Sequence, residues 1–491
     1  MSRSQDVALN RFVDNAAAGP SEESSQPSFE KGKANRMDYG LENQQQAQDQ
    51  EGSVHEGEAK FHKLGWKRLT ICLIVEAIAL GSLSLPSAFA SLGMVAGVIC
   101  SVGLGMLAMY TSFVVGQVAL KYPHVKDYAD AVALIWGRVG YELTGAMFVL
   151  FLVLVVGSHT LTGAIAWIRI VNDPTICALV WSGISAILLF ALAIPPTFTE
   201  FAILGYIDFA SIIIAIGITI IATGVTASHA PGGLDAVNWT VGPPADISFT
   251  SAFLAVTNIV FAYSFAVCQY SFMAELHTPK DYPKAIVSLG MIEIFIYTVT
   301  GAIVYRFVGD DVGSPALLSA GFKMSRIVFG IALPVIFISG SINSTVSARY
   351  IISRAFRNSP IRYTNTKAGW AVWICVLAAQ TIVAWVIAEA IPFFSDLLGI
   401  ISSLFSSGFS FYFPALFWFQ LIKEGPWYKG LHNISLSLLN GLCFLVVSRI
   451  ADIETREVML TQFSGYDYSG RRNVLQCSGM HKCEAKTLDR D

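Results

Sequence analysis

The chain has 491 residues, of which 54% are apolar and only 14% charged, against roughly 45–50% and 25% in soluble domains. Water is therefore not the solvent for most of this chain, which excludes an ordinary soluble enzyme or binding module. The net charge of −3 provides no basic surface for nucleic acid, so we expect no nucleic-acid partner.

Polar residues gather at the two ends of the chain. Residues 1–60 are rich in Gln, Ser, Glu and Asn and contain almost no clustered apolar residues, so they bury too little surface to order. We expect residues 1–64 to form a disordered cytoplasmic tail and residues 449–491 a polar C-terminal tail. Residues 65–448 form the expected transmembrane domain.

Long apolar runs follow one another between the tails. A helix needs about 20 apolar residues to cross hydrocarbon about 30 Å thick, and eleven segments approach or meet that length. They lie at 68–91, 93–119, 140–168, 174–195, 200–226, 249–275, 285–308, 326–348, 369–391, 393–422 and 431–448. Because they lack the alternation of barrel strands, the predicted fold class is an all-α polytopic membrane protein with about eleven transmembrane helices. The last segment is the weakest, because it is short and contains polar residues.

Basic residues indicate the orientation of these helices. With the N-terminus inside, the inner segments hold 16 Lys and Arg residues and the outer loops hold four. We therefore expect a cytoplasmic N-terminus. The longest outer loop, residues 227–248, has no Lys or Arg and contains Asn238-Trp239-Thr240, a pattern that makes Asn238 a glycosylation candidate.

The first helix carries a candidate interruption between Ala79 and Pro86. The proline ring removes a backbone donor and collides with the carbonyl of Ser82, four residues earlier. Gly81 makes the same turn permissive to unwinding. Interrupted helices in matching positions of two halves are typical of secondary transporters, whose freed backbone groups bind substrate near the midplane. The alternative is a kink or a packing notch, since Gly and Pro are frequent in membrane helices.

The second candidate interruption lies in the sixth helix between Phe261 and Tyr270, a run without Gly or Pro but dense in hydroxyls and aromatic rings. Taken alone, this run is typical of a packed aromatic helix. Its position favours the functional interpretation, because helices 1 and 6 each open a run of five helices. Because five is an odd number of membrane crossings, the second half begins on the opposite side of the membrane from the first. This predicts a 5+5 inverted repeat.

Three carboxylates lie at membrane depth, where a charge is expensive and usually faces a cavity. They are Glu76, Asp208 and Glu293. Glu76 lies roughly 8 Å from Gly81 along a helix and is the candidate for proton coupling. The alternative is a glutamate that only forms a hydrogen bond to a neighbouring helix, which would look identical in the sequence. His159 in the third helix could relay protons, but a lone histidine on an apolar helix is more often simply hydrogen-bonded.

The eighth helix is dense in small polar side chains after Pro334. Such side chains can line a path for substrate or an ion, or they can hold helices together by hydrogen bonds. The path candidates are Ser341, Asn343, Ser344 and Thr345.

No motif indicates an enzyme. We find no phosphate-binding G-x-x-x-x-G-K-[ST] loop and no metal-binding cluster, so we expect no cofactor, no metal site and no ATP-driven step. His124, Asp127 and Asp130 form the one rival acid–base group, and we interpret it as a solvated loop. A channel needs a ring of charges or a repeated filter, which the sequence lacks. A secondary carrier is favoured, and a sensor that binds the same solute without moving it stays open.

The stretch from Glu76 to Ile99, EAIALGSLSLPSAFASLGMVAGVI, resembles the first two helices of the amino acid/auxin permease family, whose pattern is G-x-G-x-L-S-L-P-x-A-F. The loop from Met273 to Ala285 and the tenth helix from Asp396 to Pro414 resemble the same family. The similarity covers roughly residues 65–448 and is strongest to fungal neutral amino acid permeases.

This resemblance implies eleven helices and a leucine-transporter-like inverted repeat with interrupted helices 1 and 6. It further implies symport of neutral aliphatic or aromatic amino acids by alternating access, coupled to H⁺ rather than to Na⁺. The expected location is the plasma membrane, with the vacuolar membrane and export from the vacuole as the alternative. The expected partners are the amino acid and the lipid bilayer, with no obligatory protein partner.

The family's binding residues carry over to the two candidate interruptions. Backbone groups in helix 1 are expected to meet the carboxylate and amino groups of the substrate, and helix 6 is expected to flank its side chain. The substrate-binding candidates are Gly81, Ser82, Leu83 and Ser84 in helix 1, and Tyr263, Ser264 and Phe265 in helix 6. Two departures matter, because Ala79 replaces the first glycine of the family pattern and residues 449–491 do not resemble the short family tail.

Overall fold

The structure is a computed structural model that describes residues 65–445, except residues 197, 246, 275, 357–358, 360–365 and 432. By its internal contacts the chain divides into residues 1–56 and residues 57–491. All described residues belong to the second unit. Both predicted tails, and the last residues of the eleventh predicted segment, lie outside the described residues.

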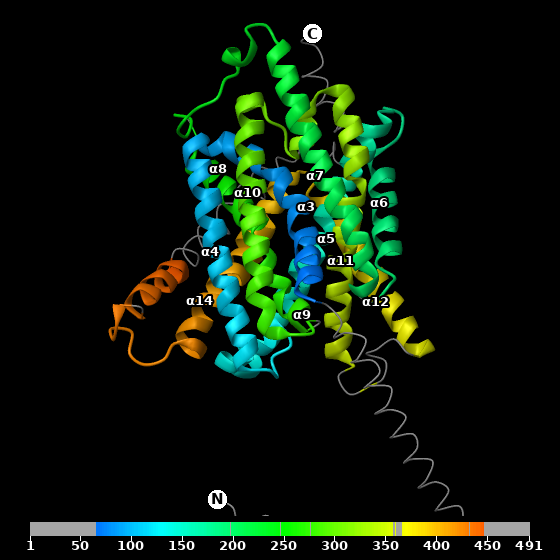
Figure 1. Ribbon diagram of the computed structural model, residues 1–491. Coiled ribbons are helices and arrows are strands. Elements are labelled where there is room, and N and C mark those ends of the chain that lie inside the picture. The colour runs from blue at the N-terminus through cyan, green and yellow to red at the C-terminus, as the bar shows by residue number, and fades with distance from the viewer. Residues whose placement is uncertain are drawn as a thin grey trace, which may run out of the picture. The chain divides into compact units, whose positions relative to one another are not determined.

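The described residues form helices and no β-strand (Figure 1). The first five apolar segments are α3 (Trp66–Leu92), α4 (Met94–Lys121), α5 (Tyr128–Val171), α6 (Ala178–Leu192) and α7 (Phe198–His229). The next four are α8 (Phe249–Ala262) with η2 (Ser264–Cys268) and α9 (Gln269–Ala274), then α10 (Tyr282–Val308), α11 (Phe322–Ala355) and α12 (Lys367–Ala390). The tenth combines α13 (Phe394–Ile401), η7 (Ser402–Ser406), η8 (Gly408–Tyr412), α14 (Phe413–Phe417) and η9 (Trp418–Ile422), and the last is Asn433–Leu445.

These helices confirm the predicted all-α membrane fold. Within the described part of the chain, seven stretches are long and apolar enough to cross a membrane. They are Met94–Lys121, Tyr128–Val171, Gly205–His229, Pro279–Asp311, Phe322–Ala355, Lys367–Ala390 and Phe394–Ile422. The 27-residue α3 and three shorter apolar helices, Ala178–Leu192, Ser251–Ala262 and Asn433–Leu445, occupy the other predicted positions.

Apolar and polar side chains are distributed between the surface and the interior as in a membrane protein. Large apolar side chains such as Ile99, Ile187 and Phe295 are about two-thirds exposed, whereas hydroxyl side chains such as Ser339 and Ser344 are buried. Water-soluble proteins seldom expose wide apolar surfaces. The outside of this bundle is therefore suited to hydrocarbon.

Helices related by five positions in the chain pack against each other. α3 contacts α8, α4 contacts α10, α5 contacts α11, and α6 contacts α12. Two five-helix halves related by a pseudo-two-fold axis in the membrane plane produce such pairs. The packing therefore agrees with the predicted 5+5 inverted repeat.

The sixth helix is interrupted where the sequence predicts. α8 ends at Ala262, the chain tightens into the 3₁₀ turns of η2, and α9 resumes at Gln269. Hydroxyl groups satisfy carbonyls at this change of pitch. Ser264 Oγ donates to the carbonyl of Phe261 at 2.7 Å, and Tyr297 Oη donates to the carbonyl of Ala262 at 3.2 Å. The break needs neither Gly nor Pro because side chains replace the lost backbone partners.

The first helix differs from the prediction. In place of an interruption, α3 runs as one helix from Trp66 to Leu92 with Pro86 inside it. Three hydroxyls donate to carbonyls in the turns before the proline: Tyr297 Oη to Ala77 at 2.7 Å, Ser82 Oγ to Ile78 at 2.7 Å, and Ser84 Oγ to Gly81 at 3.0 Å. These bonds support the turns before the proline, and none of the three reaches the carbonyl of Ser82, which loses its amide donor at Pro86.

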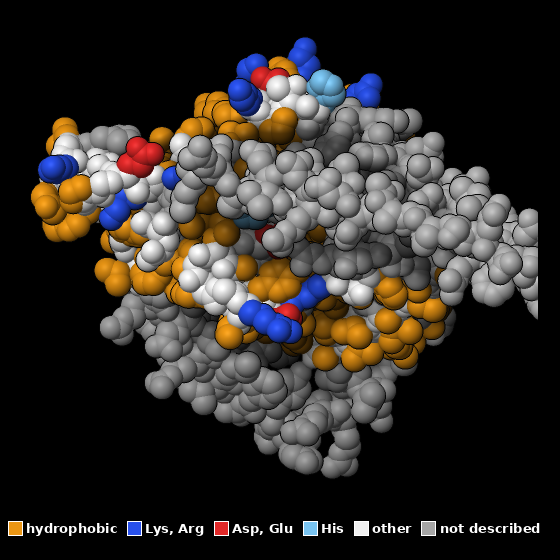
Figure 2. Space-filling model, turned by 90° about the horizontal axis from the view of Figure 1, so that it is seen from below, with side chains coloured by type: hydrophobic (Ala, Val, Ile, Leu, Met, Phe, Trp, Pro, Cys, Tyr) orange, Lys and Arg blue, Asp and Glu red, His pale blue; other side chains and the backbone are white. Residues whose placement is uncertain are grey.

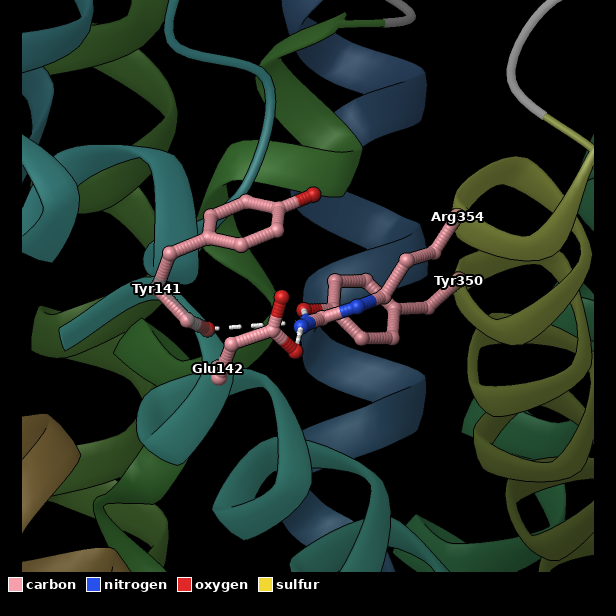
Figure 3. Close-up of polar contacts among 4 residues, drawn as sticks. All are labelled: Tyr141, Glu142, Tyr350 and Arg354. Carbon is pink, nitrogen blue, oxygen red and sulfur yellow. Dashed lines mark hydrogen bonds and ion pairs between the residues drawn. The ribbon is translucent and has the colours of Figure 1, made fainter. Parts of the chain in front are cut away.

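The C-terminal end of α11 is joined to α5 by one cluster around Arg354 (Figure 3). Its guanidinium pairs with Glu142, donates to Tyr350 Oη at 2.9 Å and lies 4.3 Å from the ring centroid of Tyr141. The ion pair is partly exposed and contributes little alone, whereas the stacked guanidinium adds a cation–π contact. A Cβ at Gly145 would collide with the ends of the Arg354 and Tyr350 side chains, so glycine leaves room for them as they are placed here. The cluster fixes two helices of one wall of the bundle.

The third helix begins earlier than predicted and bends. α5 starts at Tyr128, and Gly137 has φ 60° and ψ −145°, a conformation open to glycine. Tyr128 Oη donates to the carbonyl of Phe409 at 2.5 Å, and its ring packs edge-on against Tyr270 with centroids 5.2 Å apart. The first turn of α5 therefore connects helix 3 with helices 6 and 10.

Asp127, interpreted from sequence as part of a solvated loop, is instead the largely buried N-cap of α5. Its carboxylate accepts from the backbone N–H of Asp130 at 2.9 Å. Burial, and then the charge of Asp130, raise the pKa of Asp127 to about 6. The folded state thus binds a proton more tightly than the unfolded state, so stability falls as pH rises from about 4 to about 6.

We expect Asp127→Asn to stabilise the protein at pH 8 by about 1–3 kcal/mol, because asparagine keeps the cap and removes the buried charge. The gain should shrink steadily between pH 6 and pH 4. Thermal unfolding in detergent at several pH values measures it. Asp173→Asn is the matched control, since Asp173 is exposed and its pKa is lowered by Thr175. An equal gain for Asp127→Asn at every pH would contradict the charge explanation.

Candidate functional site

A pocket lies at the break in the sixth helix, where α3, α5, α8 with η2, and α11 meet. The space between their side chains measures about 370 Å³, including space open to solvent. The described residues that line it are Ala77 and Gly81 of α3, Phe151, Val155 and His159 of α5, Phe261, Ala262, Ser264 and Phe265 of helix 6, and Asn343 of α11. A pocket at an interrupted helix is the expected place for a transported solute.

Gly81 allows α3 and α8 to meet at one wall of this pocket. A Cβ at Gly81 would lie 2.7 Å from Ala262 Cα and 3.2 Å from Tyr297 Oη, closer than side chains normally approach backbone. The two helices that open the two halves therefore touch through backbone atoms. The absence of a side chain here determines the position of the wall.

The opposite wall is a stripe on α5. Phe151, Val155 and His159 are four residues apart, so they lie on one face of the helix. His159 is 2% exposed, and its ring is hydrogen-bonded to the backbone of Ile336. A Cβ at Gly340 would lie 2.8 Å from the Cβ of His159. The glycine of α11 thus makes room for the imidazole.

The polar groups of the pocket are neutral. None of the described residues that line it is Asp, Glu, Lys or Arg. Ser264 Oγ donates to Phe261, and Asn343 Nδ2 donates to the carbonyl of Ser339 at 3.1 Å. Nδ1 of His159 and Oδ1 of Asn343 have no hydrogen-bond partner among the described residues.

The structure brings together only part of the predicted binding set. Gly81, Ser264 and Phe265 line the pocket. Tyr263 is buried and turns towards α4, with its hydroxyl 3.3 Å from Ser101 Oγ and its ring edge-on to Tyr297. The remaining helix 1 candidates are buried residues outside the described pocket lining, and two of them donate to carbonyls of their own helix: they are Ser82, Leu83 and Ser84.

Among the helix 8 candidates, Asn343 lines the pocket and the other three make local or interhelical bonds. Ser341 Oγ donates to the carbonyl of its own helix at Ile338, 2.7 Å away. Ser344 Oγ accepts from Gln380 Nε2 at 2.5 Å. Thr345 Oγ1 donates to the carbonyl of Ala193 at 3.4 Å. In this conformation Ser344 and Thr345 therefore connect helices, which was the alternative interpretation of this run.

The predicted deep carboxylates lie in spanning helices. Asp208 in α7 and Glu293 in α10 are 0% exposed. The two carboxylate oxygens of Asp208 have no hydrogen-bond partner among the described residues. Glu76 lies within α3, but its side chain is outside the described part of the structure.

The glycosylation candidate lies in the loop between α7 and α8. Asn238 is exposed, and its Nδ2 donates to Asp310 Oδ2 at 2.8 Å. Further along the loop, the carbonyls of Thr240 and Val241 accept from the first two amides of α4. The loop thus caps that helix while leaving the asparagine on the surface, and glycosylation stays a prediction.

The sequence interpretation missed the α5 wall. The spacing of Phe151, Val155 and His159 was a visible signal, but many apolar helices show it. His159 was set aside because a buried histidine is usually fully hydrogen-bonded, whereas here Nδ1 has no partner among the described residues.

Comparisons with known proteins agree with this geometry. The family model described as transmembrane amino acid transporter protein matches residues 62–450. The N amino acid transport system protein of Neurospora crassa is 57% identical over 431 residues, covering 88% of this chain and 92% of that protein. Amino acid permease 2 of Arabidopsis thaliana is 23% identical over 432 residues, covering 78% of this chain and 85% of that protein.

Two solved structures share the fold at low identity. MhsT in complex with L-phenylalanine has a TM-score of 0.52 and 16% identity, covering 78% of this chain and 98% of that chain. Mhp1, a nucleobase-cation-symport-1 family transporter with bromovinylhydantoin bound, has a TM-score of 0.53 and 13% identity, covering 82% and 94%. These likenesses confirm the predicted leucine-transporter-like fold.

Proposed function

This chain belongs to the transmembrane amino acid transporter family, and we propose that it carries neutral amino acids by alternating access, coupled to protons. The observation that carries the proposal is the pocket at the break in helix 6, whose described lining residues include no charged side chain. An amino acid with a charged side chain would need an opposite charge in such a pocket, because an unpaired buried charge is strongly unfavourable. The names of the Neurospora relative and of the phenylalanine-bound MhsT support an amino acid as solute.

Buried carboxylates support protons as the coupling ion. Asp208 lies at 0% exposure without a hydrogen-bond partner among the described residues, so its ionised form would be poorly stabilised there. A bound proton removes that charge. Glu76, one and a half turns before Gly81, is the coupling candidate nearest in sequence to the pocket.

The distribution of basic residues supports a cytoplasmic N-terminus. Lys and Arg side chains lie among apolar ones on the face of the molecule seen from below (Figure 2). This is the end at which α3 begins and α4 ends (Figure 1). Cytoplasmic ends of membrane helices are enriched in basic residues, so this end is proposed to be cytoplasmic. As a separate proposal, we assign the protein to the plasma membrane, with the vacuolar membrane as the alternative.

Reconstitution of the purified protein tests the proposal. Proteoliposomes with separate pH and Na⁺ gradients are offered a panel of labelled neutral, acidic and basic amino acids. We expect accumulation of neutral amino acids driven by the pH gradient. Binding without accumulation would assign a sensor, and accumulation driven only by Na⁺ would overturn proton coupling.

We expect Glu76→Gln to abolish accumulation driven by a pH gradient while leaving exchange of amino acid across the membrane. Glutamine removes the titratable group and keeps nearly the same volume, so the pocket should survive. Asp208→Asn and Glu293→Gln are measured beside it. Undiminished gradient-driven uptake by Glu76→Gln would remove this residue from the coupling role.

A further inference from the structure

We propose that His159 and Asn343 form a specificity element that selects neutral amino acids whose side chain ends in an N–H or O–H donor. This inference rests on the proposed function, because it concerns the side chain of the same solute. The two residues come from α5 and α11 and line the same pocket. Each is 2% exposed, so each polar atom is shielded from bulk water.

Both residues present an acceptor. The imidazole is hydrogen-bonded to the backbone of Ile336, and a carbonyl can only accept, so the bonded ring nitrogen carries the proton. In the neutral ring Nδ1 is then a lone pair. Asn343 uses its amino group on the carbonyl of Ser339, which identifies the other atom as Oδ1. Neither acceptor has a donor among the described residues.

Unpartnered acceptors in a pocket require a donor from its occupant. A buried acceptor left without a partner is unfavourable, while the same acceptor is satisfied when a ligand supplies an N–H or O–H. Ser264 adds no competing donor, because its hydroxyl proton is directed at the carbonyl of Phe261. The pocket therefore favours a solute that donates.

The position of the acceptors assigns them to the side chain of the solute. Helix 1 contributes Gly81 to the pocket, and helix 6 contributes Ala262 and the turn at Ser264. Backbone groups of helix 1 are expected to meet the carboxylate and amino groups of the solute, and helix 6 is expected to flank its side chain. His159 and Asn343 lie on the other two helices, with Val155 and Phe151 one and two turns before the histidine on α5. An apolar stem with a donor at its end fits these walls. Glutamine and threonine have such side chains, whereas methionine and valine of similar size do not.

Binding to purified protein in detergent tests the inference without requiring transport. The readout is a preference ratio, the dissociation constant of methionine divided by that of glutamine, with valine and threonine as a second pair. In the wild type we expect both ratios to exceed one. His159→Phe keeps a ring and removes both nitrogens, and Asn343→Leu keeps the branched shape and removes both polar atoms. Each is expected to lower the ratios by roughly tenfold while methionine binding is retained.

Thr160→Val is the matched control. Thr160 is buried beside His159 on α5, but its hydroxyl donates to the carbonyl of Val156 at 2.9 Å and it does not line the described pocket. Its ratios should equal those of the wild type. A wild-type ratio below one, or ratios unchanged in both His159→Phe and Asn343→Leu, would overturn the specificity element while leaving neutral amino acid binding intact. Failure of every amino acid to bind the wild type would instead overturn the proposed function.

Discussion

Gly81→Val is expected to abolish uptake, lowering the initial rate by roughly a hundredfold or more. The new side chain would begin 2.7 Å from Ala262 Cα and 2.9 Å from Ala262 Cβ, and backbone cannot yield as a flexible side chain can. An extra side chain in a packed contact between helices costs about 1–3 kcal/mol and pushes the helices apart. Here the contact between α3 and α8 forms a wall of the pocket, so the wall would move. Gly81→Ala should give a smaller loss of roughly tenfold.

The matched control is Gly103→Ala on α4, where a Cβ would meet nothing within 4 Å. It should transport like the wild type. Restoring space with Ala262→Gly in the Gly81→Ala background should recover part of the rate, because the double variant removes one of the colliding methyl groups. Labelled uptake is corrected for the amount of folded protein. Normal uptake by Gly81→Val would show that the approach of α3 and α8 is not required for transport.

Ser264→Trp is expected to block transport by filling the pocket at the break in helix 6. Ser264 lines the pocket, and an indole occupies much of a space of about 370 Å³ that also includes open solvent. Initial uptake should fall below detection for large neutral amino acids. Uptake measured across small and large substrates shows whether the block depends on size.

Ser264→Ala separates the steric effect from the loss of a hydrogen bond. Alanine removes the hydroxyl that satisfies the carbonyl of Phe261 at 2.7 Å, so a loss of roughly tenfold or less is expected. If Ser264→Trp transported normally with an unchanged substrate range, the 3₁₀ turn would be ordinary packing. If Ser264→Ala were as inactive as Ser264→Trp, the hydroxyl rather than the volume would matter.

Most of the fold was predictable because the hydrocarbon of a membrane leaves few choices of backbone structure. A run of apolar residues long enough to cross hydrocarbon has few alternatives to a helix, so the positions of the spanning segments follow from composition alone. The break in helix 6 was predicted from its place in the repeat, although its sequence lacks Gly and Pro. The weak eleventh segment is helical from Asn433 to Leu445 within the described residues.

The features that composition could not predict depend on contacts between side chains that are distant in sequence. Pro86 indicated an interruption, but α3 continues through it as one helix, with hydroxyl groups from two helices bonded to carbonyls in the turns before it. Asp127 looked like a loop residue because nothing local indicates that Tyr270, Tyr350 and Arg354 lie close enough to interact with it. The open acceptor of His159 depends on Ile336, almost two hundred residues away, and no local pattern reveals such a partner.

The hydroxyl bonds along α3 also bear on how easily that helix could open. In a low-dielectric interior, separating a carbonyl from its amide normally leaves the oxygen bare, at a penalty of several kcal/mol. Here the carbonyls of Ala77, Ile78 and Gly81 each already accept a second bond from a hydroxyl. If the backbone hydrogen bonds broke at this turn, these oxygens would keep their hydrogen bonds to the hydroxyl groups. The barrier to local melting is thereby lowered at the part of α3 that lines the pocket.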